Sequence, residues 1–308
     1  MSTLAAQHAA DAGLGARLRL AATDIKLTHS VFALPFAILG AVLARPLDEQ
    51  WGVTVQKLTL VVAAMVLART WAMLVNRIAD ARIDAENPRT ARRAVASGRL
   101  PAQQAKVFAA ACALLFVGVC AAFWFLFKNP WPVALSVPVL AWLALYSFAK
   151  RFTAACHLLL GTALAISPIA ACLAVNPPHA LHPSILLLAG FVALWVAGFD
   201  VLYALQDEAF DRAKGLHSIP AWLGAKRAAW VSRAMHAGAA ACLFLAWRFE
   251  PRFGPLFAAA VAIAAILLVV EHLVLIRRGL AGLPMAFFTI NGCVSIAVGT
   301  AGVIDALW

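Results

Sequence analysis

The chain contains 308 residues, of which 64% are hydrophobic and only 13% are charged. A soluble domain of this size would be about half apolar and a quarter charged, so the composition excludes an ordinary soluble globular protein. The formal net charge of +11 would by itself be compatible with nucleic-acid binding. Its arrangement along the chain, given below, indicates a membrane topology instead, and we expect no nucleic-acid partner.

The apolar residues form continuous segments rich in Ala, Leu and Val rather than alternating patterns. Continuous segments of about 20 residues are typical of transmembrane helices, whereas a barrel requires alternation. Nine such segments lie near residues 28–44, 58–76, 105–127, 131–148, 154–175, 185–203, 228–247, 255–276 and 286–305. We therefore predict an all-α integral membrane protein. Nine transmembrane helices would form one bundle over residues 25–308, after a mostly polar arm without a signal peptide over residues 1–24.

Lysine and arginine are divided unequally between the two sides of this predicted bundle. The arm and the loops after spans 2, 4, 6 and 8 carry 19 of them, the opposite side carries 5, and Arg69 lies inside span 2. Loops rich in Lys and Arg remain in the cytoplasm. The pattern predicts a multi-pass protein of the cell (inner) membrane with a cytoplasmic N-terminus.

Half of the 14 acidic residues lie in two short stretches on the predicted cytoplasmic side. These residues are Asp80, Asp84 and Glu86 after span 2, and Asp200, Asp207, Glu208 and Asp211 at and beyond the end of span 6. If the helices continue, Asn76, Asp80 and Asp84 share one face, and Asp200, Asp207 and Asp211 nearly share another. Like charges grouped in this way need cations, and Mg²⁺ takes carboxylates together with phosphate oxygens.

Basic residues accompany both acidic stretches. They are Arg77, Arg82, Arg89, Arg92 and Arg93 after span 2, and Arg212 and Lys214 after span 6. Carboxylates that hold Mg²⁺ beside cations that hold phosphate oxygens suit a diphosphate ligand, with the active site at the cytoplasmic side. The alternative interpretation is a pair of solvated loops of mixed charge, which the occurrence of two such clusters on one side disfavours.

Four ordered segments carry a recognisable pattern. Residues 76–93 read NxxxDxxxD followed by RTxxR, residues 200–218 read DxxYxxxDxxxD followed by KGxxS, and Tyr146 and Lys150 form YxxxK. Together with the opening segment, residues 25–36, they resemble the UbiA-type aromatic prenyltransferase family, which includes 4-hydroxybenzoate polyprenyltransferases. The sequence departs from the family pattern at Ala94, where the family often has proline.

The resemblance implies a polyprenyltransferase that alkylates an aromatic ring with an allylic carbocation, formed from a polyprenyl diphosphate with Mg²⁺ as cofactor. The implied Mg²⁺ ligands are Asn76, Asp80, Asp84, Asp207 and Asp211. Asp200, Tyr146 and Lys150 join them as implied catalytic residues. The expected substrate-binding residues are Arg69, Arg77, Arg89, Arg93, Tyr203 and Lys214. A charge within a span is costly without a partner, so Arg69 is expected to bind the carboxylate of the aromatic acid.

The acceptor remains open between a 4-hydroxybenzoate-like acid, for ubiquinone or menaquinone biosynthesis, and a dihydroxynaphthoate or futalosine-pathway acceptor for menaquinone. The sequences of residues 87–90 (NPRT) and 215–220 (GLHSIP) look closer to the branch of the family that acts on naphthoate-type precursors in menaquinone formation. A membrane transporter is the alternative from another class, although transporter sites usually lie near the bilayer midplane. We expect no protein partner. His179 and His182 form an HxxH pair in a Pro-rich exterior loop, which we interpret as an ordinary connector, and His157 is interpreted as a core histidine.

Overall fold

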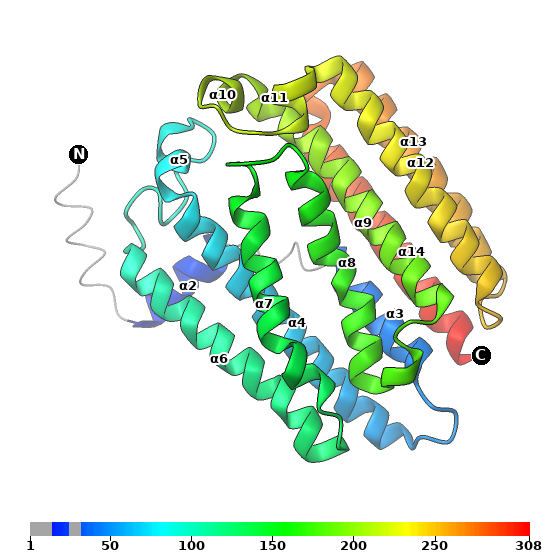
Figure 1. Ribbon diagram of the computed structural model, residues 1–308. Coiled ribbons are helices and arrows are strands. Elements are labelled where there is room, and N and C mark those ends of the chain that lie inside the picture. Colours follow the sequence, from blue (N-terminus) through cyan, green and yellow to red (C-terminus); the bar gives the residue numbers. More distant parts are fainter. Residues whose placement is uncertain (1–13, 25–31) are drawn as a thin grey trace.

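The computed structural model describes residues 14–24 and 32–308, and all regular structure within them is helical. Eight helices in this part of the chain are long and apolar enough to cross a membrane. The long helices lie side by side in one bundle (Figure 1). The prediction of an all-α membrane fold is therefore confirmed, and its cause is that a helix satisfies its own backbone hydrogen bonds in lipid.

The helices follow the predicted spans closely. The long helices are α4 (Trp51–Ala79), α6 (Ala102–Phe127), α7 (Trp131–Ala149), α8 (Cys156–Val175), α9 (Pro183–Tyr203), α12 (Ala225–Phe249), α13 (Pro255–Arg278) and α14 (Asn291–Leu307). The shorter elements are α2 (Leu14–Asp24), α3 (Leu34–Ala44), α5 (Ala81–Glu86), η2 (Pro177–His179), η3 (Ala204–Asp207), α10 (Glu208–Ala213), α11 (Ile219–Leu223), η4 (Gly279–Gly282) and the π-helical turn η5 (Met285–Ile290).

The first predicted span, residues 28–44, is the exception. Its described part is α3, which has 11 residues and is therefore about 16 Å long, against a hydrocarbon core of about 30 Å. Residues 25–31, which are most of the opening segment, lie outside the described residues. Residues 1–13 of the predicted arm also lie outside them. The count of nine spans, the arm boundary and the cytoplasmic N-terminus stay predictions.

Helix α9 forms the centre of the bundle and packs against α8 on one side and α12 on the other. Trp195 of α9 is fully buried and stacks in parallel on Phe191, with ring centroids 5.5 Å apart. Gly161 of α8 allows a close approach, because a Cβ at this position would lie 2.1 Å from the carbonyl oxygen of Ala193. This tight contact sets the register of α8 against α9, both of which carry polar residues of the site described next.

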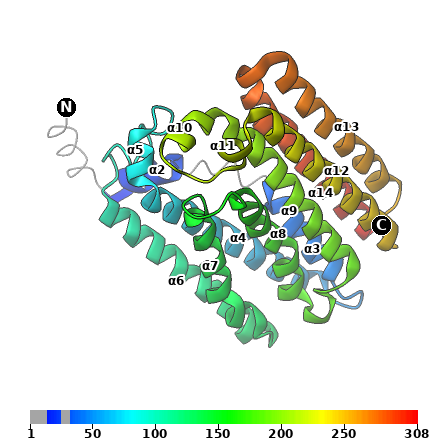
Figure 2. The same cartoon turned by 45° about the horizontal axis from the view of Figure 1, so that its top comes forward.

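Both acidic segments lie at the same end of the bundle. Figures 1 and 2 show α5, which belongs to the first acidic segment, beside α10, which belongs to the second, with α11 next to it. The loop between α12 and α13 and the C-terminus lie at the opposite end (Figure 1). The fold therefore brings two segments more than a hundred residues apart to one edge of the bundle.

Candidate active site

A cavity of about 780 Å³ opens between the two acidic segments and continues into the bundle. Its mouth is lined by side chains of both segments, and its inner part is lined by apolar side chains of α4, α6, α7 and α8. Phe123 and Leu173, near the far ends of α6 and α8, belong to this inner lining. The cavity thus joins a polar mouth at one end of the bundle to a long apolar interior.

The first acidic segment is almost a continuous helix. Helix α4 ends at Ala79, and Asp80 leaves helical geometry with φ −94° and ψ 6° before α5 begins. The Asp80 amide nevertheless donates to the Asn76 carbonyl at 2.9 Å, and the Asp84 amide donates to the Asp80 carbonyl at 2.7 Å. The four-residue spacing survives the break, and all three polar side chains line the cavity as predicted.

The second acidic segment is not the single helix that its spacing suggested. Helix α9, which carries Asp200, ends at Tyr203. The 3-10 turn η3, whose last residue is Asp207, follows before α10 begins. The expected stripe on one continuous helix is therefore wrong. The tighter turn changes the helical phase, yet Asp200, Asp207 and Asp211 all line the same cavity.

The carboxylates of the first segment have arginine partners. Arg93 Nη1 lies 2.8 Å from both oxygens of Asp84, and Arg151 Nη2 lies 3.3 Å from Asp80 Oδ1. The Asn76 amide also donates to Asp80 Oδ2 at 3.1 Å. Sequence reasoning missed Arg151, because no motif marks the residue after the YxxxK lysine.

The carboxylates of the second segment are paired with residues from elsewhere in the chain. Arg89 donates to both oxygens of Asp207, from Nε at 2.9 Å and from Nη2 at 2.5 Å. The Asn87 amide donates to Asp207 Oδ1 at 3.0 Å, and Lys150 Nζ lies 3.5 Å from Asp211 Oδ2. Because Arg89 and Asn87 follow the first segment, these bonds tie the two acidic segments together.

Asp200 is held by His157, a residue whose role the sequence analysis missed. His157 is fully buried at the start of α8, and its Nδ1 lies 2.7 Å from Asp200 Oδ2. The backbone amide of Ile219 donates to His157 Nε2 at 3.3 Å. Since Nε2 accepts a hydrogen bond, the ring proton is on Nδ1, and Nδ1–H donates a hydrogen bond to Asp200. The histidine is buried as expected, and it also orients a carboxylate of the site.

Six aspartates and eight basic side chains line the cavity, and two pKa shifts show that negative charge is crowded at the mouth. Burial and the neighbouring charge of Asp84 raise the pKa of the Asp80 carboxyl. Burial by itself would lower the pKa of the Lys150 amine, but the charges of Asp211 and Asp200 outweigh it and raise that pKa. Both shifts have the sign that crowded negative charge produces. The clustered carboxylate oxygens therefore suit a hard divalent cation, and the basic side chains among them suit the oxygens of an anionic ligand.

The structure brings together every predicted site residue except one. The predicted residues that line the cavity are Arg69, Asn76, Arg77, Asp80, Asp84, Arg89, Arg93, Tyr146, Lys150, Asp200, Tyr203, Asp207 and Asp211. Lys214 lies outside it and forms an ion pair with Glu86 at the surface. Tyr203 packs its ring on Phe287, with centroids 4.3 Å apart, and the Arg89 guanidinium lies 5.5 Å from the Tyr203 ring centre.

The departure at Ala94 has a structural consequence. The Ala94 amide donates to Asp24 Oδ1 at 2.8 Å, and Asp24 Oδ2 lies 3.3 Å from Arg77 Nε. A proline at this position would lack the N–H that makes the first of these bonds. The end of α2 is thereby anchored to the loop that follows the first acidic segment, beside the cavity mouth.

The fold and this site define a class of helical membrane protein that can hold an anionic group at the end of a long apolar chain. The chain belongs to the UbiA prenyltransferase family, whose sequence model matches residues 33–292. An apo structure of a UbiA homolog from Aeropyrum pernix K1 is 32% identical, with a TM-score of 0.79 over 91% of this chain and 98% of that one.

Two further comparisons bear on the fold and on the sequence. A UbiA homolog from Archaeoglobus fulgidus, bound to GPP and Mg²⁺, has the same fold, with a TM-score of 0.66 and 16% identity over 94% of this chain and 100% of that one. The 4-hydroxybenzoate octaprenyltransferase of Nitrosomonas europaea is 34% identical over 170 residues, which are 54% of this chain and 55% of the relative. This chain therefore spans about half the length of the curated relatives it matches.

Proposed function

We propose that this protein transfers a polyprenyl group from an allylic polyprenyl diphosphate to the ring of an aromatic acid, in a reaction that requires Mg²⁺. The observation that carries this proposal is the cavity itself, with two carboxylate clusters and their paired cations at the mouth of a long apolar interior. Membership of the UbiA family supports it. The polar mouth fits a diphosphate, and the apolar interior fits the attached hydrocarbon chain.

The residues at the mouth fit Mg²⁺. Asp80, Asp84, Asp207 and Asp211 offer hard oxygen ligands, which Mg²⁺ prefers, and Asn76 adds an amide oxygen. When bound there, Mg²⁺ would neutralise the diphosphate oxygens and so assist departure of the leaving group. Asp200, hydrogen-bonded to His157, would orient the second cluster.

The basic residues now paired with the carboxylates are suited to a second role. Arg89, Arg93 and Lys150 each neutralise a carboxylate of the site. When the carboxylates bind Mg²⁺ instead, these basic side chains would be available to bind phosphate oxygens at the same mouth. As the allylic C–O bond breaks, its electron pair leaves with the diphosphate, and positive side chains already in place stabilise that charge.

The apolar interior would protect the cation that remains on the prenyl chain. Water would capture an allylic cation, whereas a cavity lined by Phe, Leu and Ala side chains excludes it. The ring carbon of the acceptor forms the new C–C bond, and a ring proton is then lost. Tyr146 and Tyr203 line the region where the acceptor would lie.

For the acceptor we propose a 4-hydroxybenzoate-like acid, used in ubiquinone or menaquinone biosynthesis at the inner membrane. The name of the curated relative supports this choice. Arg69 lines the cavity two helical turns from Asn76, a position from which it would bind the acceptor carboxylate. A dihydroxynaphthoate is the competing acceptor, since the loop sequences resemble that branch.

The test is a competition assay. Purified protein in lipid receives Mg²⁺, one polyprenyl diphosphate, and equal amounts of 4-hydroxybenzoate and 1,4-dihydroxy-2-naphthoate, and the products are identified by mass. We expect prenylated 4-hydroxybenzoate with release of one diphosphate per product. A prenylated naphthoate would correct the acceptor alone. The absence of diphosphate release with every donor and acceptor would reject the enzyme and favour the transporter.

A further inference from the structure

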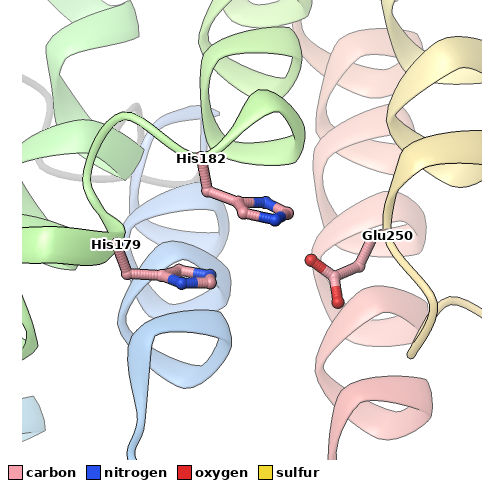
Figure 3. Close-up of side chains that lie close together, drawn as sticks. All are labelled: His179, His182 and Glu250. Carbon is pink, nitrogen blue, oxygen red and sulfur yellow. The ribbon is translucent and has the colours of Figure 1, made fainter.

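Three potential metal ligands meet at the end of the bundle opposite the acidic segments. His179 ends the turn η2, His182 precedes α9, and Glu250 follows α12. One ligand atom of each lies within 4.8 Å of the others. Figure 3 shows both imidazole rings extending from their loop toward the Glu250 carboxylate. The sequence analysis interpreted the two histidines as a connector, because nothing in the sequence places Glu250 beside them.

Hydrogen bonds orient His182 for binding a metal. Its Nδ1 lies 2.7 Å from the Ser184 hydroxyl oxygen, and that hydroxyl donates to Glu250 Oε2 at 2.8 Å. The hydroxyl has one O–H group, and it uses this group in the hydrogen bond to Glu250. In the contact with His182 the hydroxyl oxygen must therefore accept, and His182 Nδ1–H must donate. Nε2 of a neutral His182 then keeps its lone pair, which is the form in which histidine binds metals.

His179 supplies an independent observation. Its Nε2 is inaccessible to solvent and has no hydrogen-bond partner among the described residues. Buried polar atoms are usually satisfied, so a buried nitrogen without a protein partner can take a metal ion or a water as its partner. In its neutral form the imidazole can bind a metal through the Nε2 lone pair.

Glu250 completes the set as a charged carboxylate. Only 3% of Glu250 is exposed, and Arg252 Nε donates to Glu250 Oε1 at 2.7 Å. The Ser184 hydroxyl also donates to Glu250 Oε2, and both donors favour the charged form of the carboxylate. Each carboxylate oxygen has two lone pairs, so Oε2 can accept from Ser184 and still bind a cation.

We propose that His179, His182 and Glu250 form a binding site for a divalent transition metal of the zinc type. Two imidazoles and one carboxylate are a ligand set that Zn²⁺ uses, with a fourth position left for water. The site would join the loop between α8 and α9 to the end of α12. Ser184 and Arg252 would hold the ligands in position, as hydrogen-bonded neighbours of metal ligands commonly do.

Binding would require a small movement of the rings. The two imidazoles stack at a centroid distance of 4.6 Å with an interplanar angle of 7°, so their lone pairs lie in nearly parallel planes and cannot converge on one point between the rings. In a tetrahedral site with Zn–N bonds of about 2.0–2.1 Å, the two nitrogens lie about 3.3 Å apart. The rings must tilt toward each other, and they can do so because they belong to a short connecting loop.

The test uses untagged protein in detergent, stripped with chelator and then saturated with Mg²⁺ to occupy the acidic clusters. Co²⁺ is the probe, because tetrahedral Co²⁺ absorbs strongly in the visible range and octahedral Co²⁺ absorbs weakly. We expect one equivalent to give strong visible bands that stoichiometric Zn²⁺ removes. His179→Asn and His182→Gln should each lose these bands. His217→Ala removes an exposed histidine at the other end of the bundle and should keep them.

A second variant distinguishes a loss of metal binding from a folding defect. Ser184→Ala keeps all three ligands and should weaken Zn²⁺ binding about 10- to 100-fold, measured by chelator competition. His179→Asn should retain Mg²⁺-dependent diphosphate release, so the site and the proposed function fail separately. Weak octahedral bands only, or strong bands that persist in His179→Asn, would overturn the proposal. Folding is checked by the elution volume of each variant.

Discussion

The two acidic segments offer the same residue types but are built differently. In the first, Asp84 is bound by Arg93, nine residues away in the sequence. In the second, Asp207 is bound by Arg89 across 118 residues, and Asp200 is bound by His157 from another helix. The first segment therefore combines a local partner with one that is 71 residues away, Arg151 beside Asp80. The partners of Asp207 and Asp200 all come from distant parts of the chain.

The difference extends to solvent exposure. The Asp80–Arg151 pair of the first segment is partly exposed, with side-chain exposures of 23% and 40%. Asp207 in the second segment is 6% exposed beside an Arg89 that is 31% exposed. Loss of a partner costs more for a buried charge than for an exposed one. Asp207 should consequently be more sensitive than Asp80 to loss of its partner. The same holds for Asp84, which is 8% exposed in its pair with Arg93, and both segments are needed for the proposed reaction.

The largest effect is expected from removing a carboxylate of either segment. Asp80→Ala and Asp207→Ala should each reduce Mg²⁺-dependent prenyl transfer by about 10³-fold or more, because each deletes an expected metal ligand. The assay is diphosphate release with a fixed donor and acceptor. If one variant retained most of its activity, the two segments would not act on one diphosphate. Glu208→Ala removes a neighbouring acid outside the cavity lining and serves as control.

Arginine variants compare the two segments directly. Arg89→Leu leaves Asp207 buried without its main partner, and should destabilise the metal-free protein by about 2–3 kcal/mol. Arg151→Leu removes a more exposed partner and should cost less than about 1 kcal/mol. Unfolding in SDS, with and without Mg²⁺, measures both. Equal losses of stability in the two variants would contradict the distinction between the buried Arg89–Asp207 pair and the more exposed Arg151–Asp80 pair.

His157 tests the packing that organises the second segment. His157→Ala removes the donor that orients Asp200, and should lower activity or apparent Mg²⁺ affinity about 10- to 100-fold. His157→Asn, which can still donate to Asp200, should recover part of the loss. A purely structural histidine would change stability and leave the Mg²⁺ dependence of the rate unaltered.

Arg69 addresses the acceptor rather than the diphosphate. Arg69→Leu should raise KM for the aromatic acid about tenfold or more, as expected for loss of a charge-assisted hydrogen bond. KM for the prenyl donor should change much less. Similar increases for both substrates would place Arg69 in a structural role.

The smallest effect is expected at Ala94. Ala94→Pro removes the N–H that donates to Asp24, and should cost about 1 kcal/mol of stability. Ala94→Ser keeps this N–H and is the matched control. Limited proteolysis near residue 24 would report release of α2, and equal cleavage in the two variants would reject the anchoring contact.

Several features of this protein follow from the amino-acid sequence by itself. Span length and apolar content predicted the membrane helices, because helix formation in lipid depends on local composition. The two carboxylate motifs predicted which residues line the cavity, since the motif spacing keeps Asn76, Asp80 and Asp84 on one side of nearly helical backbone. The break at η3 was not predictable from spacing, because a 3-10 turn and an α-helix use similar residues.

Apart from the local pair of Asp84 and Arg93, tertiary structure decided the partners of the carboxylates. His157 was recognisable as a buried histidine, but only the packing of α8 on α9 places it against Asp200. Arg151 carries no motif, and Glu250 is separated from His179 and His182 by two membrane helices. A sequence pattern describes neighbours within a few residues, whereas hydrogen bonds and metal sites require groups to meet in space. The chemistry of each segment is thus local, and its pairing is a property of the folded bundle.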